Sequence, residues 1–273
     1  MTVASSGVVP ATASRSSSRL MRVCVRSVPP LLVLVAVIVL WETSASGAGR
    51  RVIPPPSAIL NAGIENFEQL RRATLATSYE AIGGFILGTV GGLLVAFATS
   101  RWGAARDVLL PVAIASSAIP IIAVAPILNN WFGVLNPMSK MMMAALLVFF
   151  PVLINVTRGL VEVKPASVEL MRSYAASDLA VLRKLRVPNM LPFLFTAMKV
   201  GATLAFIGAL VGEYFGGSSD VLGFVVLTSM SSGSFALAWA GILLGAGAAI
   251  VAYLIVSILE RVAIPWHSEL EAN

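Results

Sequence analysis

Six stretches of this 273-residue chain are long and apolar enough to cross a lipid bilayer. A helix needs about 20 consecutive, mostly apolar residues to span the hydrocarbon, and a helix leaves no backbone polar group unpaired there. The chain is therefore predicted to be an all-α membrane protein with six transmembrane helices. The predicted spans cover residues 28–47, 75–98, 108–128, 138–157, 194–214 and 235–258.

The composition agrees with a chain whose solvent is mostly lipid. Charged residues make up 12% of the sequence, against about a quarter in a typical soluble domain. The basic residues that give the net charge of +6 flank the apolar stretches instead of forming one stripe, so no nucleic-acid partner is predicted. The single cysteine, Cys24, excludes an intramolecular disulfide and a cysteine metal cluster, and the lone His267 lies in the polar C-terminal tail. No metal site and no cofactor are predicted.

The first apolar stretch has two interpretations. Arg15, Arg19, Arg22 and Arg26 precede it and small residues follow it, a pattern that also fits a cleaved signal peptide. Because apolar character runs from Val28 past Trp41 and further spans follow, an uncleaved span is favoured. The expected organisation is then a disordered tail over 1–27, a transmembrane domain over 28–262 and a second tail over 263–273.

Lysine and arginine placement predicts the orientation of the spans. With the N-terminus inside, the inner segments hold 14 of the 19 basic residues, and the outer segments hold the other five, which are Arg50, Arg51, Arg71, Arg72 and Lys140. Both termini and the charged segment 158–193 are therefore expected on the cytoplasmic side.

Small residues and prolines predict how the spans pack. Gly84, Gly88 and Gly92 recur every fourth residue, as do Gly241 and Gly245, and such spacing lets helix backbones approach closely in lipid. The third span contains three prolines, which predict one kinked helix with freed carbonyl groups. These prolines are Pro111, Pro120 and Pro126.

The charged segment between the fourth and fifth spans is patterned as two short amphipathic helices. Lys164-Pro165 can open the first helix, Ser177 can cap the second, and Val187-Pro188 is expected to end it. An elbow over residues 175–177 joins them. Two interpretations remain open from the pattern alone: the helices lie on the inner leaflet, or their apolar faces enter the cleft of a partner protein.

The order of residues in this segment resembles the cytoplasmic coupling loop of binding-protein-dependent ABC importer permeases. Glu169 and Pro188 match the family pattern at the right separation, Leu185 and Val187 replace Ile and Leu, and Ala175 stands where the family has glycine. The stretches IPPPSAIL, AIPIIAVAPILNNWFG, LLVFFPVLINVTRGL and IGALVGEYFGG also look like the sulfonate/taurine/nitrate branch. The resemblance covers roughly residues 53–262.

The resemblance implies a permease subunit of the bacterial cytoplasmic membrane that imports a small solute and is not itself an enzyme. Its expected partners are a dimer of ATP-binding subunits, a second copy of the permease that forms a homodimer with the first, and an extracytoplasmic solute-binding protein. The phosphate-binding pattern G-x-x-x-x-G-K-[ST] is absent from the sequence, in agreement with a separate ATPase. The residues expected to couple to that ATPase are Glu169, Met171, Arg172, Tyr174, Ala175, Leu179, Leu182, Leu185 and Pro188.

Candidate residues for the solute path lie in or next to the predicted spans. Glu80 and Glu213 are ionisable residues within predicted spans, which are functional candidates, although solvation near the outer face also accounts for them. Ser116, Ser117 and Asn155 can line the path or hydrogen-bond between helices, and together with Glu213 they form the predicted translocation path. The expected solute is a sulfonate, taurine or nitrate; the alternative is a neutral heteroaromatic solute such as a pyrimidine or a riboflavin or thiamine precursor.

Two other classes of protein compete with a permease. A membrane enzyme or scaffold requires clustered acid/base or metal-binding side chains, and none is visible in the sequence. A channel or proton-driven carrier that works without an ATPase requires charged relays within the spans, and these are sparse. No catalytic residue is therefore predicted.

Overall fold

The structure is a computed structural model that describes residues 32–45, 52–100 and 103–265. Every regular element in these ranges is a helix, in agreement with the all-α prediction. The predicted tail over 1–27 and the last residues of the chain, 266–273, lie outside the described residues. The chain divides into two compact units, Met1–Ala58 and Ile59–Asn273.

The described part of the first predicted span is the helix Leu32–Ala45. Its large apolar side chains from Leu32 to Leu40 are exposed, as expected for a helix surrounded by lipid. Near its end, the Glu42 carboxylate accepts hydrogen bonds from the backbone N–H of Ser57 at 3.1 Å and from the Ser57 hydroxyl at 2.6 Å. Residues 28–31 and 46–47 of the predicted span lie outside the described residues.

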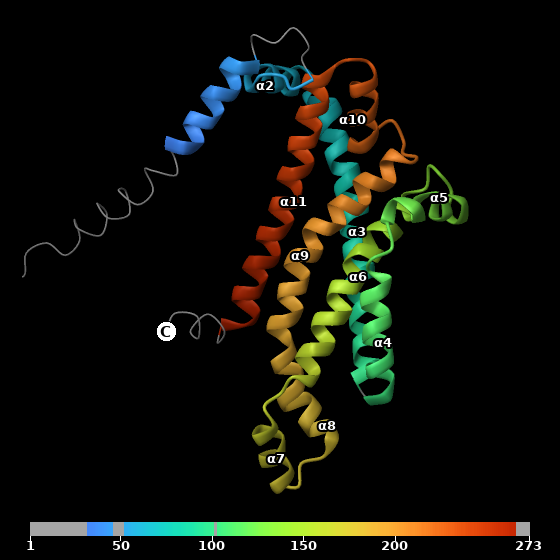
Figure 1. Cartoon of the computed structure of the whole chain (residues 1–273), viewed down its shortest axis with the longest axis vertical. Helices are drawn as coiled ribbons and strands as arrows, with labels where there is room; N and C mark the ends of the chain where they lie inside the picture. The colour runs from blue at the N-terminus through green and yellow to red at the C-terminus, as the bar shows by residue number, and fades with distance from the viewer. Residues whose placement is uncertain (1–31, 46–51, 101–102, 266–273) are drawn as a thin grey trace, which may run out of the picture. The chain divides into compact units, whose positions relative to one another are not determined.

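The following helices carry the labels of Figure 1. In chain order they are α2 (Pro56–Glu65), α3 (Phe67–Ser100), α4 (Gly103–Ser116), α5 (Ile121–Phe132), α6 (Pro137–Val161), α7 (Pro165–Ser173), α8 (Asp178–Val181), the π-helix η1 (Leu182–Arg186), α9 (Val187–Tyr214), α10 (Leu222–Ser231) and α11 (Phe235–Ala263).

Four helical segments among the described residues are long and apolar enough to cross a membrane. They are α3, α6, the continuous segment Asp178–Tyr214 and α11. A bent pair of shorter helices brings the number to five if the pair forms one span. These helices coincide with the second to sixth predicted spans, and the chain is a multi-pass membrane protein.

The third predicted span is broken instead of kinked. Leu110–Ser116 and Ile121–Phe132 meet at 90°, so the prediction of one helix over 108–128 is wrong. Pro120 adopts an extended conformation directly before α5, and the residue before a proline is itself disfavoured in the helical region. Pro111 and Pro126 lie within α4 and α5 without breaking them. One of the three prolines therefore separates the helices.

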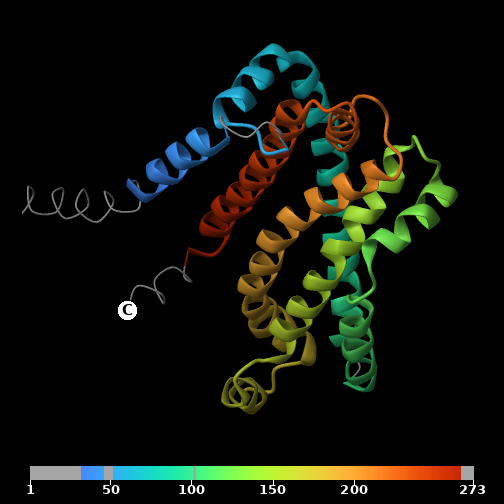
Figure 2. The same ribbon diagram turned by 45° about the horizontal axis from the view of Figure 1, so that its top comes forward.

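Helix α6 packs between α3 and α9 at the centre of the second unit (Figures 1 and 2). A methyl group added at Gly88 of α3 would lie 2.5 Å from the carbonyl oxygen of Ala145, and one at Gly84 would lie 2.5 Å from that of Met141. On the other side, a methyl group at Gly208 of α9 would lie 2.6 Å from the Cα of Ala144. The close packing predicted from the spacing of Gly84, Gly88 and Gly92 is thus confirmed, because both neighbouring helices approach the backbone of α6.

The second glycine pair behaves differently. A methyl group at Gly241 would meet the side chain of Val226 at 2.9 Å, and one at Gly245 would meet Leu210 at 3.4 Å and Leu222 at 3.7 Å. These neighbours are side chains of α9 and α10. The pair therefore receives side chains from other helices, and the predicted backbone-to-backbone approach is wrong there.

Candidate functional site

The first amphipathic helix of the charged segment forms where the sequence predicts it. Lys164 precedes α7 and Pro165 occupies its first position, where a missing N–H costs nothing. After α7 the chain turns through Ala175, whose φ of 53° is the only positive value at a non-glycine residue in the described chain. This left-handed conformation is the reason a glycine fits that position in the family pattern. Alanine keeps the elbow at a conformational cost of about 1–2 kcal/mol.

The second amphipathic helix starts as predicted but does not end as predicted. The Ser177 hydroxyl accepts a hydrogen bond from the N–H of Ala180 at 3.3 Å and caps α8. The chain then passes through η1 directly into α9, and the Val187 N–H donates to the carbonyl of Leu182. Pro188 lies in the first turn of α9, where proline is tolerated, so the prediction that Val187-Pro188 ends the helix is wrong.

The base of this helical loop is tied to α6. The Asn189 side-chain amide donates to the carbonyl oxygen of Gly159 at 2.7 Å and to that of Glu162 at 3.3 Å. These carbonyls belong to the last turn and the C-cap of α6, which lack partners within their own helix. A methyl group at Gly159 would lie 2.6 Å from the Cα of Met190. The end of α6 and the start of α9 therefore form one stiff support for α7 and α8.

The tip of the loop exposes apolar and charged side chains together. Tyr174 is 80% exposed and Leu179 is 62% exposed. We define the coupling surface as the exposed side chains of Glu169, Leu170, Arg172, Tyr174 and Leu179.

The other predicted coupling residues lie deeper. Met171, Leu182, Leu185 and Pro188 are half-buried, and Leu182 packs against the core of the bundle. Ala175 is exposed and shapes the elbow. Leu170 was not predicted as part of the site, although its spacing of four residues from Tyr174 places the two on one helix face. The structure thus divides the predicted set into exposed side chains and side chains that attach the loop to the bundle.

Four buried polar side chains meet at the end of the bundle opposite α7 and α8 (Figure 1). They are Thr77 and Glu80 of α3, Lys140 in the first turn of α6 and Glu213 in the last turn of α9. Lys140 and Glu213 are each only 1% exposed. We call these four residues the buried polar cluster.

Hydrogen bonds connect this cluster to the start of α10. The Glu213 carboxylate accepts from the backbone N–H of Gly223 at 2.6 Å and from the Thr77 hydroxyl. The Thr77 hydroxyl oxygen in turn accepts from the N–H of Leu222 at 3.0 Å. The first N–H groups of a helix have no partner within it, and Val221, which precedes α10, offers no side-chain cap. Side chains of α3 and α9 therefore cap α10.

The sequence also allowed that Glu80 and Glu213 are solvated near the outer face. That interpretation is wrong, because both side chains are buried. Sequence reasoning also missed Thr77 and Lys140 as their neighbours. The signal in the sequence was Lys140, a single lysine at the start of an apolar stretch. From the sequence it is counted among the outer segments. The Lys140 ammonium instead donates to the carbonyl oxygen of Val134 and interacts electrostatically with both carboxyl groups.

The residues predicted to line a path come from different elements. Ser116 and Ser117 stand at the break between α4 and α5, where the Ser117 hydroxyl donates to the carbonyl of Ile114 at 2.7 Å. Asn155 lies within α6 and donates to the carbonyl of Pro151 at 2.8 Å. Each of these bonds joins residues three or four positions apart in the chain. The described structure contains no hydrogen bond that joins these residues to one another or to Glu213.

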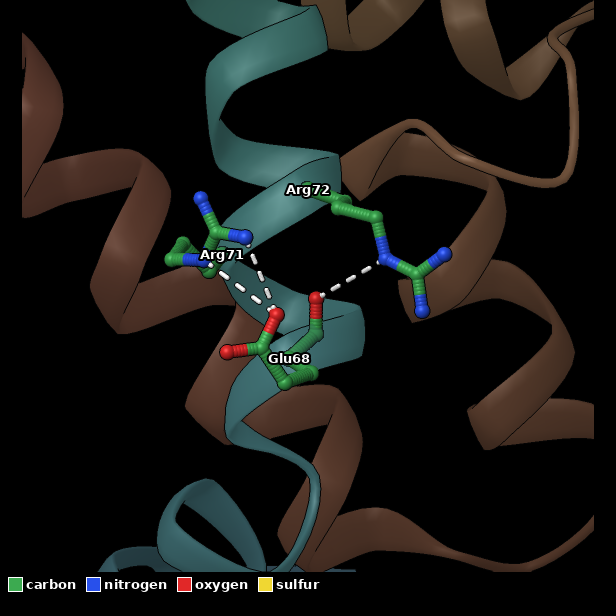
Figure 3. Close-up of polar contacts among 3 residues, drawn as sticks. All are labelled: Glu68, Arg71 and Arg72. Carbon is green, nitrogen blue, oxygen red and sulfur yellow. Dashed lines mark hydrogen bonds and ion pairs between the residues drawn. The ribbon is translucent and has the colours of Figure 1, made fainter.

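Charged side chains elsewhere on the bundle are also paired. At the start of α3, Arg71 contacts the Glu68 carboxylate at 3.0 Å, and Arg72 donates to the Glu68 carbonyl at 3.3 Å (Figure 3). These side chains are exposed, so the pair contributes little to stability. Lys199 of α9 and Glu260 of α11 form a half-buried ion pair at 2.7 Å, which joins two helices within the bundle.

Several apolar helices and a structured, exposed helical loop define a multi-pass membrane protein. The chain belongs to the family of binding-protein-dependent transport system inner membrane components, whose model matches residues 88–266. It is thus a permease component of an ABC transporter, and its resemblance to the sulfonate/taurine and related branch is confirmed.

Three relatives illustrate this similarity. The formylaminopyrimidine transport permease protein of Halalkalibacterium halodurans is 30% identical over 89% of this chain and 98% of its own length. The riboflavin transport system permease protein of Chloroflexus aurantiacus is 31% identical over 86% of this chain and 88% of its own. The taurine transport system permease protein of Escherichia coli is 27% identical over 80% of this chain and 82% of its own.

Proposed function

We propose that this permease imports a small solute and that the coupling surface docks into a cleft of a separate ATP-hydrolysing subunit. The observation that carries the proposal is the exposed surface on α7 and α8, held by a stiff base. Tyr174 and Leu179 project apolar side chains from that surface, while Glu169 and Arg172 flank them with charge. Apolar anchors with flanking charges are what a helix presents to a groove in a partner.

The stiff base allows this surface to act as a lever. ATP binding draws two ATPase subunits together and moves the docked α7 and α8. Because Asn189 ties the start of α9 to the end of α6, the motion passes to both helices at once. Helices that pack as closely as α3, α6 and α9 move as rigid bodies. The bundle then rocks, and a central cavity opens alternately to the two sides of the membrane.

The surrounding assembly follows from this function. The permease works as a homodimer in the bacterial cytoplasmic membrane, with an ATPase dimer inside and a solute-binding protein outside. Each chain has six spans, of which the first includes the helix Leu32–Ala45. Both termini face the cytoplasm, as the excess of lysine and arginine on that side indicates. Ser116, Ser117, Asn155 and Glu213 remain the proposed contacts along the path.

A sulfonate, taurine or nitrate is the first proposed cargo, in keeping with the branch of the family. A neutral heteroaromatic solute is the second, and one observation favours it. Lys140 of α6 is buried and bonded to Val134, and Lys199 of α9 is paired with Glu260. Both cations are therefore engaged inside the protein. Competition of labelled-solute uptake by taurine and by a formylaminopyrimidine separates the two cargoes.

Replacing Glu169 by Lys tests the docking proposal. The reversed charge on the coupling surface should abolish both solute uptake and co-purification of the ATPase subunit, while the permease still reaches the membrane. Glu65→Lys is the matched control, because Glu65 is also exposed but lies in α2. Normal uptake and normal co-purification of the Glu169→Lys variant would refute the docking proposal.

A further inference from the structure

The buried polar cluster contains two neighbouring carboxyl groups, Glu80 and Glu213. Their side chains lie close enough for a hydrogen bond between the two carboxyl groups. Two ionised carboxylates cannot form such a bond, because an ionised carboxylate only accepts hydrogen bonds. One of the two groups must therefore carry a proton, as in other pairs of carboxyl groups that share a site.

The surrounding donors identify which group is ionised. Glu213 accepts from the Gly223 N–H at 2.6 Å and from the Thr77 hydroxyl, and it lies at the N-terminal end of α10. Donors of this kind, together with the positive end of a helix, stabilise a carboxylate. Among the described residues Glu80 has no such donor, and one oxygen of each carboxyl group, Oε2 of Glu80 and Oε1 of Glu213, has no hydrogen-bond partner. Glu80 is thus the proton donor and Glu213 the acceptor.

The charges of the cluster balance only in that state. Lys140 supplies one positive charge, and Glu213 supplies one negative charge. A second buried carboxylate would remain uncompensated, which costs several kcal/mol. Among the described residues, the other titratable group that interacts with the cluster is Tyr214, the neighbour of Glu213 in α9. The described residues of α10, Leu222–Ser231, include no charged side chain.

We propose that Glu80 holds a proton that it shares with Glu213, and that this protonated pair fixes the start of α10 to α3 and α9. Loss of the proton places two carboxylates side by side against a single ammonium group. Glu213 is then pushed away from Glu80 and its bonds to Gly223 and Thr77 weaken, so α10 is released. The cluster is a proton-dependent latch, and it exists whether or not the coupling surface binds an ATPase.

Infrared spectroscopy of the full-length protein in lipid nanodiscs tests this proposal. A protonated carboxyl group has a C=O stretching band that an ionised one lacks. The wild-type protein should show this band at neutral pH, and Glu80→Gln should remove it completely. Glu213→Gln should also remove it, because Lys140 then compensates an ionised Glu80. Glu65→Gln, at an exposed position in α2, should leave the band unchanged.

The wild-type protein provides a second measurement that needs no variant to fold. As the pH is raised, the band should disappear together with a drop in the thermal unfolding temperature, since deprotonation breaks the latch. Absence of the band at neutral pH, its persistence in folded Glu80→Gln, or its loss on raising the pH without any change in the unfolding temperature would each overturn the proposal.

Discussion

The two ends of the bundle differ in whether their charged side chains are exposed or buried. At one end, Glu169, Arg172 and Tyr174 stand exposed on short helices, and their elbow depends on an alanine with positive φ. At the other end, Glu80, Lys140 and Glu213 are buried and bonded to one another or to the backbone. Exposed charges cost nothing to leave unpaired, whereas buried ones must be satisfied. The first end is therefore suited to exchanging contacts with a partner, and the second to holding helices in place.

The largest expected effect on stability comes from overfilling the buried end. A methyl group at Gly223 would lie 2.6 Å from the Cβ of Glu213 and 2.8 Å from its Oε2. Gly223→Ala should therefore displace the carboxylate and destabilise the protein by about 2–3 kcal/mol. Gly247→Ala is the control, because nothing lies within 4 Å of a methyl group there. Equal thermal unfolding temperatures for the two variants would show that the buried end tolerates rearrangement.

A comparable free-energy loss is expected at the exposed end, but it concerns binding of the ATPase subunit and not the stability of the permease. Tyr174 is the one aromatic side chain of the coupling surface and is highly exposed, and aromatic anchors dominate many interfaces. Tyr174→Ala should weaken ATPase binding by about 2 kcal/mol, or roughly 30-fold, and leave the unfolding temperature of the isolated permease unchanged. Titration of the detergent-solubilised permease with the ATPase subunit measures this. A lower unfolding temperature at unchanged affinity would place Tyr174 in the fold of the loop.

A smaller effect is expected at the joint between the loop and the bundle. Asn189→Ala removes the donor to the carbonyls of Gly159 and Glu162 and should cost about 1–2 kcal/mol. Because the support of the lever is loosened, ATP hydrolysis by the assembled complex should continue while solute uptake falls. Thr196→Ala is the control, since Thr196 bonds only to the carbonyl of Pro192 one turn earlier in α9. Parallel losses of hydrolysis and uptake would contradict a separate role for this joint.

The smallest effect concerns the elbow itself. Glycine at position 175 relieves the positive φ of the alanine but adds freedom to the unfolded chain. The net result should be a stabilisation of up to about 1 kcal/mol, seen as a small rise in unfolding temperature. Ala176→Gly should instead lower it, because the described backbone has no positive φ at Ala176. A fall in stability for Ala175→Gly would show that the elbow is not strained.

Local patterns predicted those parts of the fold that depend on neighbours in the sequence. The apolar stretches, the start of α7 at Pro165, the cap at Ser177 and the packing of Gly84 and Gly88 are all of this kind. The break before α5 and the passage through η1 were missed, because a proline can break, bend or start a helix and its context decides which.

The contacts between distant residues were missed for a different reason. Glu213 meets Thr77, and Asn189 meets Gly159, only after the helices have packed. No spacing within one segment encodes such a pair. The two short helices α7 and α8 could be predicted because their signals are local, whereas the buried polar cluster needed the structure.

A spin label on Tyr174 tests the central claim, that the coupling surface docks on an ATPase, most directly. Because Cys24 is the only cysteine, Cys24→Ser gives a background in which Tyr174→Cys can be labelled alone. The label should be mobile in the isolated permease and become immobilised when the ATPase subunit is added, while a label at Tyr79, an exposed residue of α3, stays unchanged. A label at position 174 that remains equally mobile in a complex that binds and hydrolyses ATP would contradict the claim.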